Sequence, residues 1–375
     1  MSAGRIWHNK KTDRYVAILE CGRDESGKRK QRFRNATTKK EARQLLLQMQ
    51  RELEEGMLDP SKASLGDYLQ DWLRDVVRHR VATRTFERYE SVLRCHVIPQ
   101  LGGVRLAALR PDQVQRRYGE MLDQGMSPAT VQKTHGALHS ALRHAVRMRM
   151  IPRNPSDDLV LPKIRRPEIK PLSEEEIARM LAVAEGTNVG AALLTLLTTG
   201  MRRGEVLALR WEDVDFERRT VAVRRTLEQS SQGIALKEPK TRRSARIIAL
   251  PSATVDALRS HKAKQAEARL TTGPAFNHSG LVFPGPRGDL WRPDNFGAAC
   301  HKVFKRAELS CRLHDLRHTQ ATLLLQQGVH PKVVQERLGH ANVSITLDIY
   351  SHVAPHMQEE AAARIDEALA AALAG

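Results

Sequence analysis

Along the first sixty residues, apolar and polar positions alternate in short runs and then change to a helical spacing. The alternating runs are Arg5–Trp7, Tyr15–Cys21 and Lys30–Arg34. Turn-forming residues such as Arg23–Gly27 separate them, so the pattern predicts a small antiparallel sheet of three strands. Thr38 then marks the start of a predicted helix over Lys39–Glu55, which Gly56 ends.

Residues 64–156 carry helix caps and helix breakers that predict an all-helical segment. Ser64 and Asp67 form an N-cap pair before the first helix, and Pro111 and Pro128 each stand in the first turn of a later one. The predicted helices cover Leu65–Val77, Thr83–Cys95, Pro111–Gly125 and Ser127–Met150. The last of them mixes cationic with apolar side chains, which is typical either of a solvated face or of a face that contacts a phosphate backbone.

A proline-rich segment separates these helices from the rest of the chain. Leu161–Pro171 holds three prolines and several charges, so it is predicted to be a solvated linker. Ser173 with Glu176 caps the helix that follows, and an apolar stripe over Met357–Leu373 predicts a tail helix. We therefore expect a multidomain, mainly helical protein with small β elements, divided into domains at 1–60, 64–160 and 173–375 with a linker at 161–172.

Length and composition agree with several cores and favour a polyanionic partner. The 375 residues exceed what one hydrophobic core usually supports. The 61 Lys and Arg residues outnumber the 43 Asp and Glu residues, and the resulting net charge of +18 favours nucleic acid. No apolar run is long enough to span a membrane, and the four cysteines lack metal-ligand spacing. We therefore expect a cytoplasmic protein with reduced thiols. It would associate with the nucleoid when bound to DNA and make no membrane contact.

Local clusters of charge supply candidate DNA contacts. Residues 27–34 form the strongest cluster and fall on the predicted sheet, so they fit either a solvated hairpin or a sheet that enters a DNA groove. Two arginines of the last predicted helix before the linker are further candidates. The complete set is Lys28, Arg29, Lys30, Arg32, Arg34, Arg143 and Arg147.

The side chains that could carry chemistry lie in short motifs of the second half of the chain. Guanidinium forks match phosphate oxygens, a phenol can attack phosphorus, and imidazole and ammonium groups can move protons. Such a set suits a phosphodiester better than a peptide or a glycosidic bond. Its members are Arg202, Lys240, His314, Arg317, His340 and Tyr350.

Spacing places His314 and Arg317 on one face of a predicted helix. They are three residues apart at its start, where the positive end of the helix dipole favours an anion. A rival interpretation is a zinc site, since His314 and His318 are four residues apart. The zinc-protease pattern has Glu after the first histidine, however, and this chain has Asp315.

The same spacing argument joins Glu205 to Arg202, because three residues separate them and they share a helix face. Alone, this pair could be an ordinary surface ion pair. Lys240 lies in the turn region before a predicted strand at Ser244–Leu250 that follows another at Thr220–Thr226. Lys237 is a close competitor for the role of the reactive lysine.

Together and in this order, the motifs resemble those of the tyrosine recombinase family, also called the phage integrase family. They read Thr-Thr-Gly-Met-Arg-Arg-Gly-Glu (198–205), Pro-Lys-Thr (239–241), His-Asp-Leu-Arg-His (314–318), Leu-Gly-His (338–340) and Asp-Ile-Tyr-Ser-His (348–352). The resemblance spans about residues 173–353. It implies a mixed α/β catalytic domain there, a helical core-binding domain before it, and an arm-type DNA-binding sheet and helix at the front.

The resemblance also implies a role for each residue. Tyr350 attacks a DNA phosphodiester and forms a 3′-phosphotyrosine, while Arg202 and Arg317 hold the phosphate and Glu205 supports Arg202. His314 assists proton removal, and Lys240 protonates the leaving 5′ oxygen. His340 contacts the phosphate. The mechanism needs no metal ion and no other cofactor, because the arginines carry the electrostatic stabilisation.

As a function, the resemblance implies a bacterial site-specific recombinase that integrates a mobile element or a phage. It would work as a homotetramer on double-stranded DNA, with directionality or DNA-bending factors as further partners. One alternative is a Xer-like resolvase, a class that usually lacks the basic domain before residue 64. Another is a non-catalytic DNA-binding regulator, which the intact set of catalytic residues disfavours.

Overall fold

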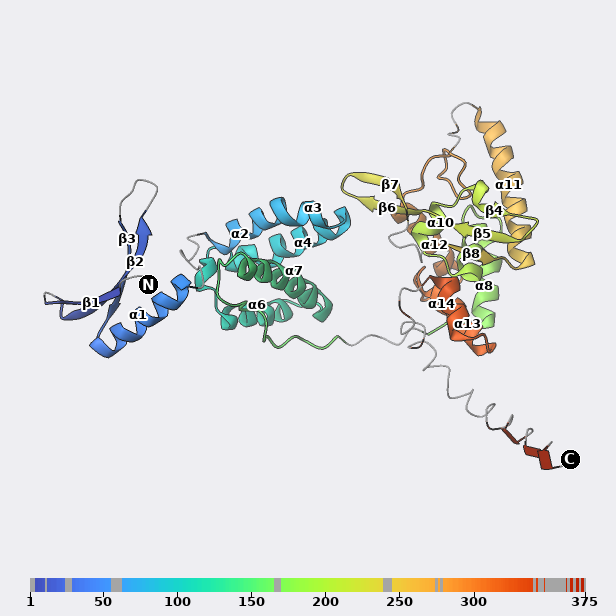
Figure 1. Cartoon of the computed structure of the whole chain (residues 1–375). Helices are drawn as coiled ribbons and strands as arrows, with labels where there is room; N and C mark the ends of the chain where they lie inside the picture. Colours follow the sequence, from blue (N-terminus) through green and yellow to red (C-terminus); the bar gives the residue numbers. More distant parts are fainter. Residues whose placement is uncertain are drawn as a thin grey trace. The chain divides into compact units, whose positions relative to one another are not determined.

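The structure is a computed structural model in which contacts divide the chain into two compact units, Met1–Arg166 and Pro167–Gly375 (Figure 1). Each unit is described by itself. No helix in the described part of the chain is both long and apolar enough to cross a membrane. The described residues are 4–10, 12–23, 29–54, 63–164, 170–238, 245–273, 276 and 279–339, with single positions between 342 and 373.

The first unit begins with a sheet and a helix. The strands β1 (Gly4–Asn9), β2 (Arg14–Arg23) and β3 (Arg29–Ala36) pair antiparallel in that order, which confirms the predicted sheet. The helix α1 (Lys39–Glu54) starts where expected, because the Thr38 hydroxyl accepts a hydrogen bond from the Glu41 amide at 3.2 Å. Its predicted end at Gly56 lies outside the described residues.

The register of the sheet decides which side chains face α1. Ala17 and Leu19 of β2 pack with Met49 of α1, so they mark the covered face. Arg34 and Arg32 pair with these two residues, and the alternation of a strand therefore places both arginines on the α1 side. The opposite face carries Trp7, which is 53% exposed, and Phe33, which is 60% exposed.

The rest of the first unit is helical, as predicted. Ser64 and Ser127 cap their helices through hydrogen bonds from the Asp67 and Thr130 amides. The predicted helix Leu65–Val77 is not uniform, because its second half is a π-helical turn, Leu73–Val77. Arg143 and Arg147 are both exposed. The helices are α2 (Leu65–Trp72), α3 (Arg78–Arg80), α4 (Thr83–His96), α5 (Ile98–Leu101), α6 (Pro111–Asp123) and α7 (Pro128–Arg147).

The second unit combines helices with two small sheets (Figure 1). Its first helix, α8, is capped by the predicted box, in which Ser173 accepts from the Glu176 amide and Glu176 accepts from the Ser173 amide. The helices are α8 (Glu174–Ala184), α9 (Gly190–Thr199), α10 (Arg203–Leu207), α11 (Ser252–Thr272), α12 (Pro293–Arg306), α13 (Asp315–Gln326) and α14 (Pro331–Leu338).

The sheets of this unit agree with the prediction only in part. Strand β5 (Thr220–Val223) pairs with β4 (Val214–Asp215) and β8 (Arg246–Ala249), as the predicted strands require. The expected strand Thr220–Thr226 is too long, however, because the chain leaves this sheet after Val223. Arg225 turns instead to the carboxylates of Glu212 and Asp213, and a separate hairpin of β6 (Thr226–Ser230) and β7 (Gly233–Lys237) follows.

The end of α9 sets the spacing between three helices of this unit. Gly200 closes α9 in the left-handed region at φ +63°. A Cβ atom at this position would lie 2.3 Å from Leu338 of α14 and 2.7 Å from the Gln320 amide oxygen of α13. The absence of a side chain at Gly200 therefore allows α13 and α14 to approach the end of α9.

Replacing Gly200 with alanine should therefore destabilise the second unit through both backbone strain and overpacking. Gly186→Ala is a matched control, since Gly186 has φ +72° and open space where its Cβ atom would stand. We expect Gly200→Ala to lower the free energy of unfolding by about 1–3 kcal/mol more than the control. Denaturant unfolding of both variants measures this difference, and equal losses would show that the neighbouring helices move aside.

Candidate active site

Arg202 and Glu205 lie on one short turn that follows α9. Arg202 is the extended residue before α10, and its backbone amide donates to the Glu205 carboxylate at 2.9 Å. The Nη1 atom of Arg202 donates to the other carboxylate oxygen, also at 2.9 Å. Glu205 is only 5% exposed, whereas the Arg202 side chain is 42% exposed. The three-residue spacing noted in the sequence thus produces a buried carboxylate that orients a partly exposed guanidinium.

Arg317 enters the same region from the first turn of α13. Its side chain is buried, and it donates through Nη1 to the Gly200 carbonyl and through Nη2 to the Leu338 carbonyl at 2.7 Å. Burial, followed by the charge of Arg202, lowers the pKa of Arg317. Two of its donors are therefore used for position, and the guanidinium has little freedom to reorient.

The C-terminal end of α14 brings the two arginines together. Arg202 donates through Nη2 to the Gly339 carbonyl at 3.1 Å, next to the Leu338 carbonyl that binds Arg317. Gly339 ends the helix in the left-handed region at φ +68°. His340 follows directly in the chain but lies outside the described residues.

His314 stands immediately before α13, beside the arginines. Its ring packs edge-on against that of His318, with the ring centres 5.2 Å apart. Burial, followed by the charges of His318 and Arg317, lowers the pKa of His314, which keeps the imidazole neutral and able to accept a proton near neutral pH. A cavity of about 380 Å³ opens here, lined by Met201, Arg203, Arg312, Leu313, His314 and Arg317.

The zinc interpretation has no further support in this geometry. His314 and His318 do lie side by side on α13. Asp315, between them in sequence, accepts hydrogen bonds from the Arg312 amide and guanidinium. Within the described ranges, no group of three or more His, Cys, Asp or Glu side chains is placed to hold a metal ion.

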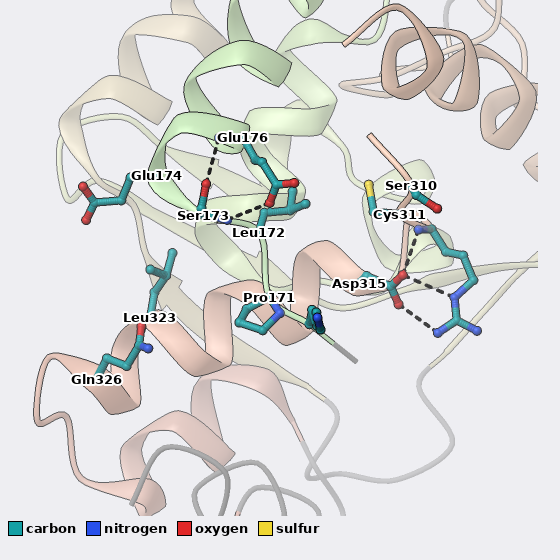
Figure 2. Close-up of a pocket in the computed structure, with 12 residues that line it drawn as sticks. Pro171, Leu172, Ser173, Glu174, Glu176, Ser310, Cys311, Asp315, Leu323 and Gln326 are labelled. Carbon is teal, nitrogen blue, oxygen red and sulfur yellow. Dashed lines mark hydrogen bonds and ion pairs between the residues drawn. The ribbon is translucent and has the colours of Figure 1, made fainter. Parts of the chain in front are cut away.

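A second cavity, of about 920 Å³, lies at the start of the unit and does not contain the arginine pair (Figure 2). Figure 2 shows Pro171 and Leu172 between the α8 cap and the Asp315 end of α13. The Leu172 amide donates to the Thr319 hydroxyl at 3.0 Å. The end of the linker segment is thereby attached to the helix that carries His314 and Arg317 at its start.

Several predicted residues cannot be placed. Lys240, His340, Tyr350 and Lys28 lie outside the described residues, and only the backbone of Arg29 and Lys30 is described, within β3. The competitor Lys237 lies on β7, where its ammonium forms an ion pair with Glu228 at 2.5 Å. This pairing leaves Lys237 engaged inside its own hairpin.

One residue of the site was not recognised from the sequence. Arg246, the first residue of β8, has a side chain that is 7% exposed, and it binds both oxygens of Glu205. In the sequence it is one of four basic residues between 240 and 246, and nothing in their spacing distinguishes it. Only the pairing of β8 with β5 brings it beside α10 and α14.

Comparison with known proteins shows that the chain belongs to the phage integrase family. The Phage integrase family matches residues 170–357, and the phage integrase N-terminal SAM-like domain matches residues 64–122. A XerC-like tyrosine recombinase of Caldanaerobacter subterraneus is 31% identical, over 94% of this chain and 96% of its own length. An integrase of Streptomyces ambofaciens is 30% identical, over 92% of this chain and 91% of its own length.

Solved structures share the fold. The Tn1549 transposon integrase in complex with a circular intermediate DNA superimposes with a TM-score of 0.68 at 21% identity, over 80% of this chain and 99% of that chain. A lambda integrase tetramer bound to a Holliday junction gives a TM-score of 0.59 at 16% identity, over 92% of this chain and 94% of that chain. By its family and its relatives, the protein is a tyrosine recombinase, the class of enzyme that cuts and rejoins DNA strands at specific sites.

From this geometry, Arg202→Lys and Arg317→Lys should each lower the rate of DNA cleavage. Lysine keeps the charge but lacks the planar fork, so it cannot bind a phosphate and a backbone carbonyl at the same time in this geometry. We expect a loss of about 10²–10³-fold in rate, as for the loss of an oxyanion contact, with little loss of DNA affinity. Single-turnover cleavage and a binding assay measure the two quantities, with Arg225→Lys as control. Near-normal cleavage by both variants would show that the arginines only add charge.

Proposed function

We propose that this recombinase integrates a mobile genetic element and that Tyr350 is its nucleophile. The observation that carries the proposal is the meeting of Arg202 and Arg317 at the end of α14, where both guanidinium groups are fixed by backbone carbonyls. Two fixed forks beside a neutral imidazole form a site for one phosphodiester. The names of similar proteins, which include the ICEBs1 integrase, an integrase of Mycobacterium phage D29 and the Tn1549 transposon integrase, support the same conclusion.

In the proposed reaction, the phenolic oxygen of Tyr350 attacks phosphorus and the 5′ oxygen leaves. The phosphotyrosyl bond conserves the energy of the broken bond, so a new 5′ hydroxyl can be joined without ATP. Arg202 and Arg317 bind the non-bridging oxygens and stabilise the charge of the pentacoordinate state.

Proton transfers complete the proposed reaction. The neutral imidazole of His314 assists removal of the phenolic proton, and Lys240 protonates the leaving oxygen. His340 supports the phosphate, and Glu205 positions Arg202. These roles require no metal ion, because the guanidinium groups supply the positive charge.

We propose that three domains divide the work on DNA. Residues 1–60 bind an arm-type site, 64–160 bind the core site with Arg143 and Arg147 at the backbone, and 173–375 catalyse the reaction, with 161–172 as linker. In the sheet of the first domain, we propose that the open face with Trp7 and Phe33 enters the DNA groove, and not the face that carries Arg32 and Arg34. It projects exposed side chains away from α1, as a sheet that enters a groove requires.

Four protomers are proposed to assemble on double-stranded DNA. In the C-terminal tail, the described positions Ile365, Leu369 and Leu373 are all more than half exposed. An exposed apolar stripe of this kind supports docking on a neighbouring protomer rather than on the protein's own core. Directionality or DNA-bending factors are further proposed partners, and the site of action is the bacterial nucleoid in the cytoplasm.

A second candidate function is resolution of chromosome dimers, which the XerC-like name of one relative favours. The β1–β3 sheet with α1 argues for integration, because a resolvase usually lacks a domain of this kind before its helical domain. A non-catalytic regulator is the remaining alternative. Experiments on Tyr350 and on the first domain separate the three functions.

The proposed nucleophile is tested by Tyr350→Phe. This variant lacks only the phenolic oxygen, so it should bind DNA as the wild type does and form no covalent adduct. The substrate is a supercoiled plasmid that carries the DNA on both sides of the gene, and the reaction is stopped with detergent to trap the adduct. Sequencing the trapped DNA then identifies the cleavage site.

An adduct of wild-type yield in the Phe variant would remove Tyr350 from the mechanism. Failure of the wild type to form any adduct on this plasmid would favour the regulator. Activity should persist in EDTA, and inhibition that zinc reverses would restore the metal interpretation.

The proposed division of labour is tested by a fragment that starts at Ser64. Because Ser64 itself forms the N-cap of α2, the cut keeps this cap while it removes the sheet, α1 and the Ala63 carbonyl that accepts from the Leu106 amide. The fragment should cleave a nicked duplex of the trapped site but fail to complete integration in cells. Full integration by the fragment would contradict the arm-type role and favour the resolvase.

A further inference from the structure

Arg246 joins three elements of the candidate active site without being one of its recognised catalytic residues. Its Nη1 and Nη2 atoms donate to the two carboxylate oxygens of Glu205, at 3.2 Å and 2.8 Å. Its Nε atom donates to the Arg337 carbonyl in the last turn of α14, at 2.7 Å. Each of the three nitrogens of this guanidinium thus donates to α10 or α14.

The contacts of Arg246 extend to the turn that ends α14. A Cβ atom at Gly339 would lie 3.1–3.3 Å from the guanidinium and the Cδ atom of Arg246. The side chain of Arg246 therefore packs directly under this turn. Since Arg202 binds the Gly339 carbonyl and Arg317 binds the Leu338 carbonyl, a shift of the turn would move acceptors of both arginines.

Arg246 also determines what Glu205 can do for Arg202. The carboxylate accepts four hydrogen bonds, two from Arg246 and two from Arg202. With both oxygens held by the Arg246 fork, the carboxylate presents a fixed lone pair to Nη1 of Arg202. The fork of Arg202 is in this way oriented through two successive ion pairs that begin on β8.

We propose that Arg246 is a positioning residue of the recombination reaction, which sets the orientation of Arg202 through Glu205 and the position of the α14 end through the Arg337 carbonyl. This proposal rests on the proposed function, since Arg202 must bind the scissile phosphate for its orientation to matter.

Electrostatics supports the same role. Burial by itself raises the pKa of Glu205, but the hydrogen bonds and charge of Arg246, followed by those of Arg202, outweigh it and hold the pKa below its ordinary value. Arg317 is the third charged group that faces this carboxylate. In the wild type Glu205 therefore stays ionised at neutral and mildly acidic pH. Without Arg246 the buried carboxylate would keep the burial effect and lose its main partner, so its pKa would rise.

The test uses the full-length protein and a nicked duplex of the site that the wild type cleaves. Arg246→Lys keeps one charge but not the fork, and Arg246→Met removes both. We expect the first-order rate of adduct formation to fall by about 10²-fold in Arg246→Met, as for a small misplacement of a catalytic group, with DNA affinity within about twofold of the wild type. The double variant Arg246→Met, Glu205→Gln should form the adduct no more slowly than the slower single variant, because both residues act on Arg202 through the same series of contacts.

A pH profile separates positioning from a structural role. Protonation of Glu205 removes an acceptor of Arg202, so the rate for Arg246→Met should fall as the pH drops from 8 to 6, while the wild-type rate changes less. The control is Arg225→Met, because Arg225 also binds two carboxylates of this unit but has no contact to Arg202 in the described structure. The control should lose thermal stability without a change in the pH profile.

Two outcomes would overturn the proposal. One is an Arg246→Met rate and pH profile that match those of Arg225→Met at equal loss of melting temperature. The other is a fall in DNA affinity that accounts for the whole loss of adduct. If the wild type itself forms no adduct on the duplex, the proposed function fails instead, and the two failures are thereby distinguished.

Discussion

Three guanidinium groups close the C-terminal end of α14, and the geometry of the candidate active site depends on this contact. The carbonyls of residues 337, 338 and 339 accept hydrogen bonds from Arg246, Arg317 and Arg202 respectively. The last carbonyls of a helix have no partners within the helix, and the negative end of its dipole attracts cations. Because each arginine comes from a different element, the helix end acts as a common support that assembles distant motifs into one site.

This arrangement concentrates positive charge at a place where two of the three arginines are buried. Arg317 is 4% exposed and the Arg246 side chain 7% exposed, and one carboxylate, that of Glu205, stands among the three arginines. Buried charges are tolerated only where ion pairs and hydrogen bonds compensate them, and here carbonyl dipoles and one carboxylate do so. The excess of positive charge that remains is what a phosphodiester in a pentacoordinate transition state requires.

Much of the fold followed from local signals. Caps at Ser64 and Ser173 predicted helix starts that the structure confirms, because these signals act within a few residues. The β6–β7 hairpin and the early end of β5 were not predicted. The chain leaves the sheet where Arg225 pairs with Glu212 and Asp213, a contact that no pattern of hydrophobic and polar positions contains. The division of the chain into three domains and the roles of the site residues stay predictions.

The sequence by itself determined the family and the chemistry of this protein, because motifs in a set order record which residue types the reaction needs. It also determined the neighbours that lie within one helical turn, such as Arg202 with Glu205 and His314 with Arg317. Tertiary structure alone decided how these pairs meet, through the close approach that Gly200 permits and the turn at Gly339. It also selected Arg246 from a run of similar basic residues and turned Arg32 and Arg34 toward α1. Such assignments depend on strand register and on contacts between distant segments, and the local spacing of residues determines neither of them.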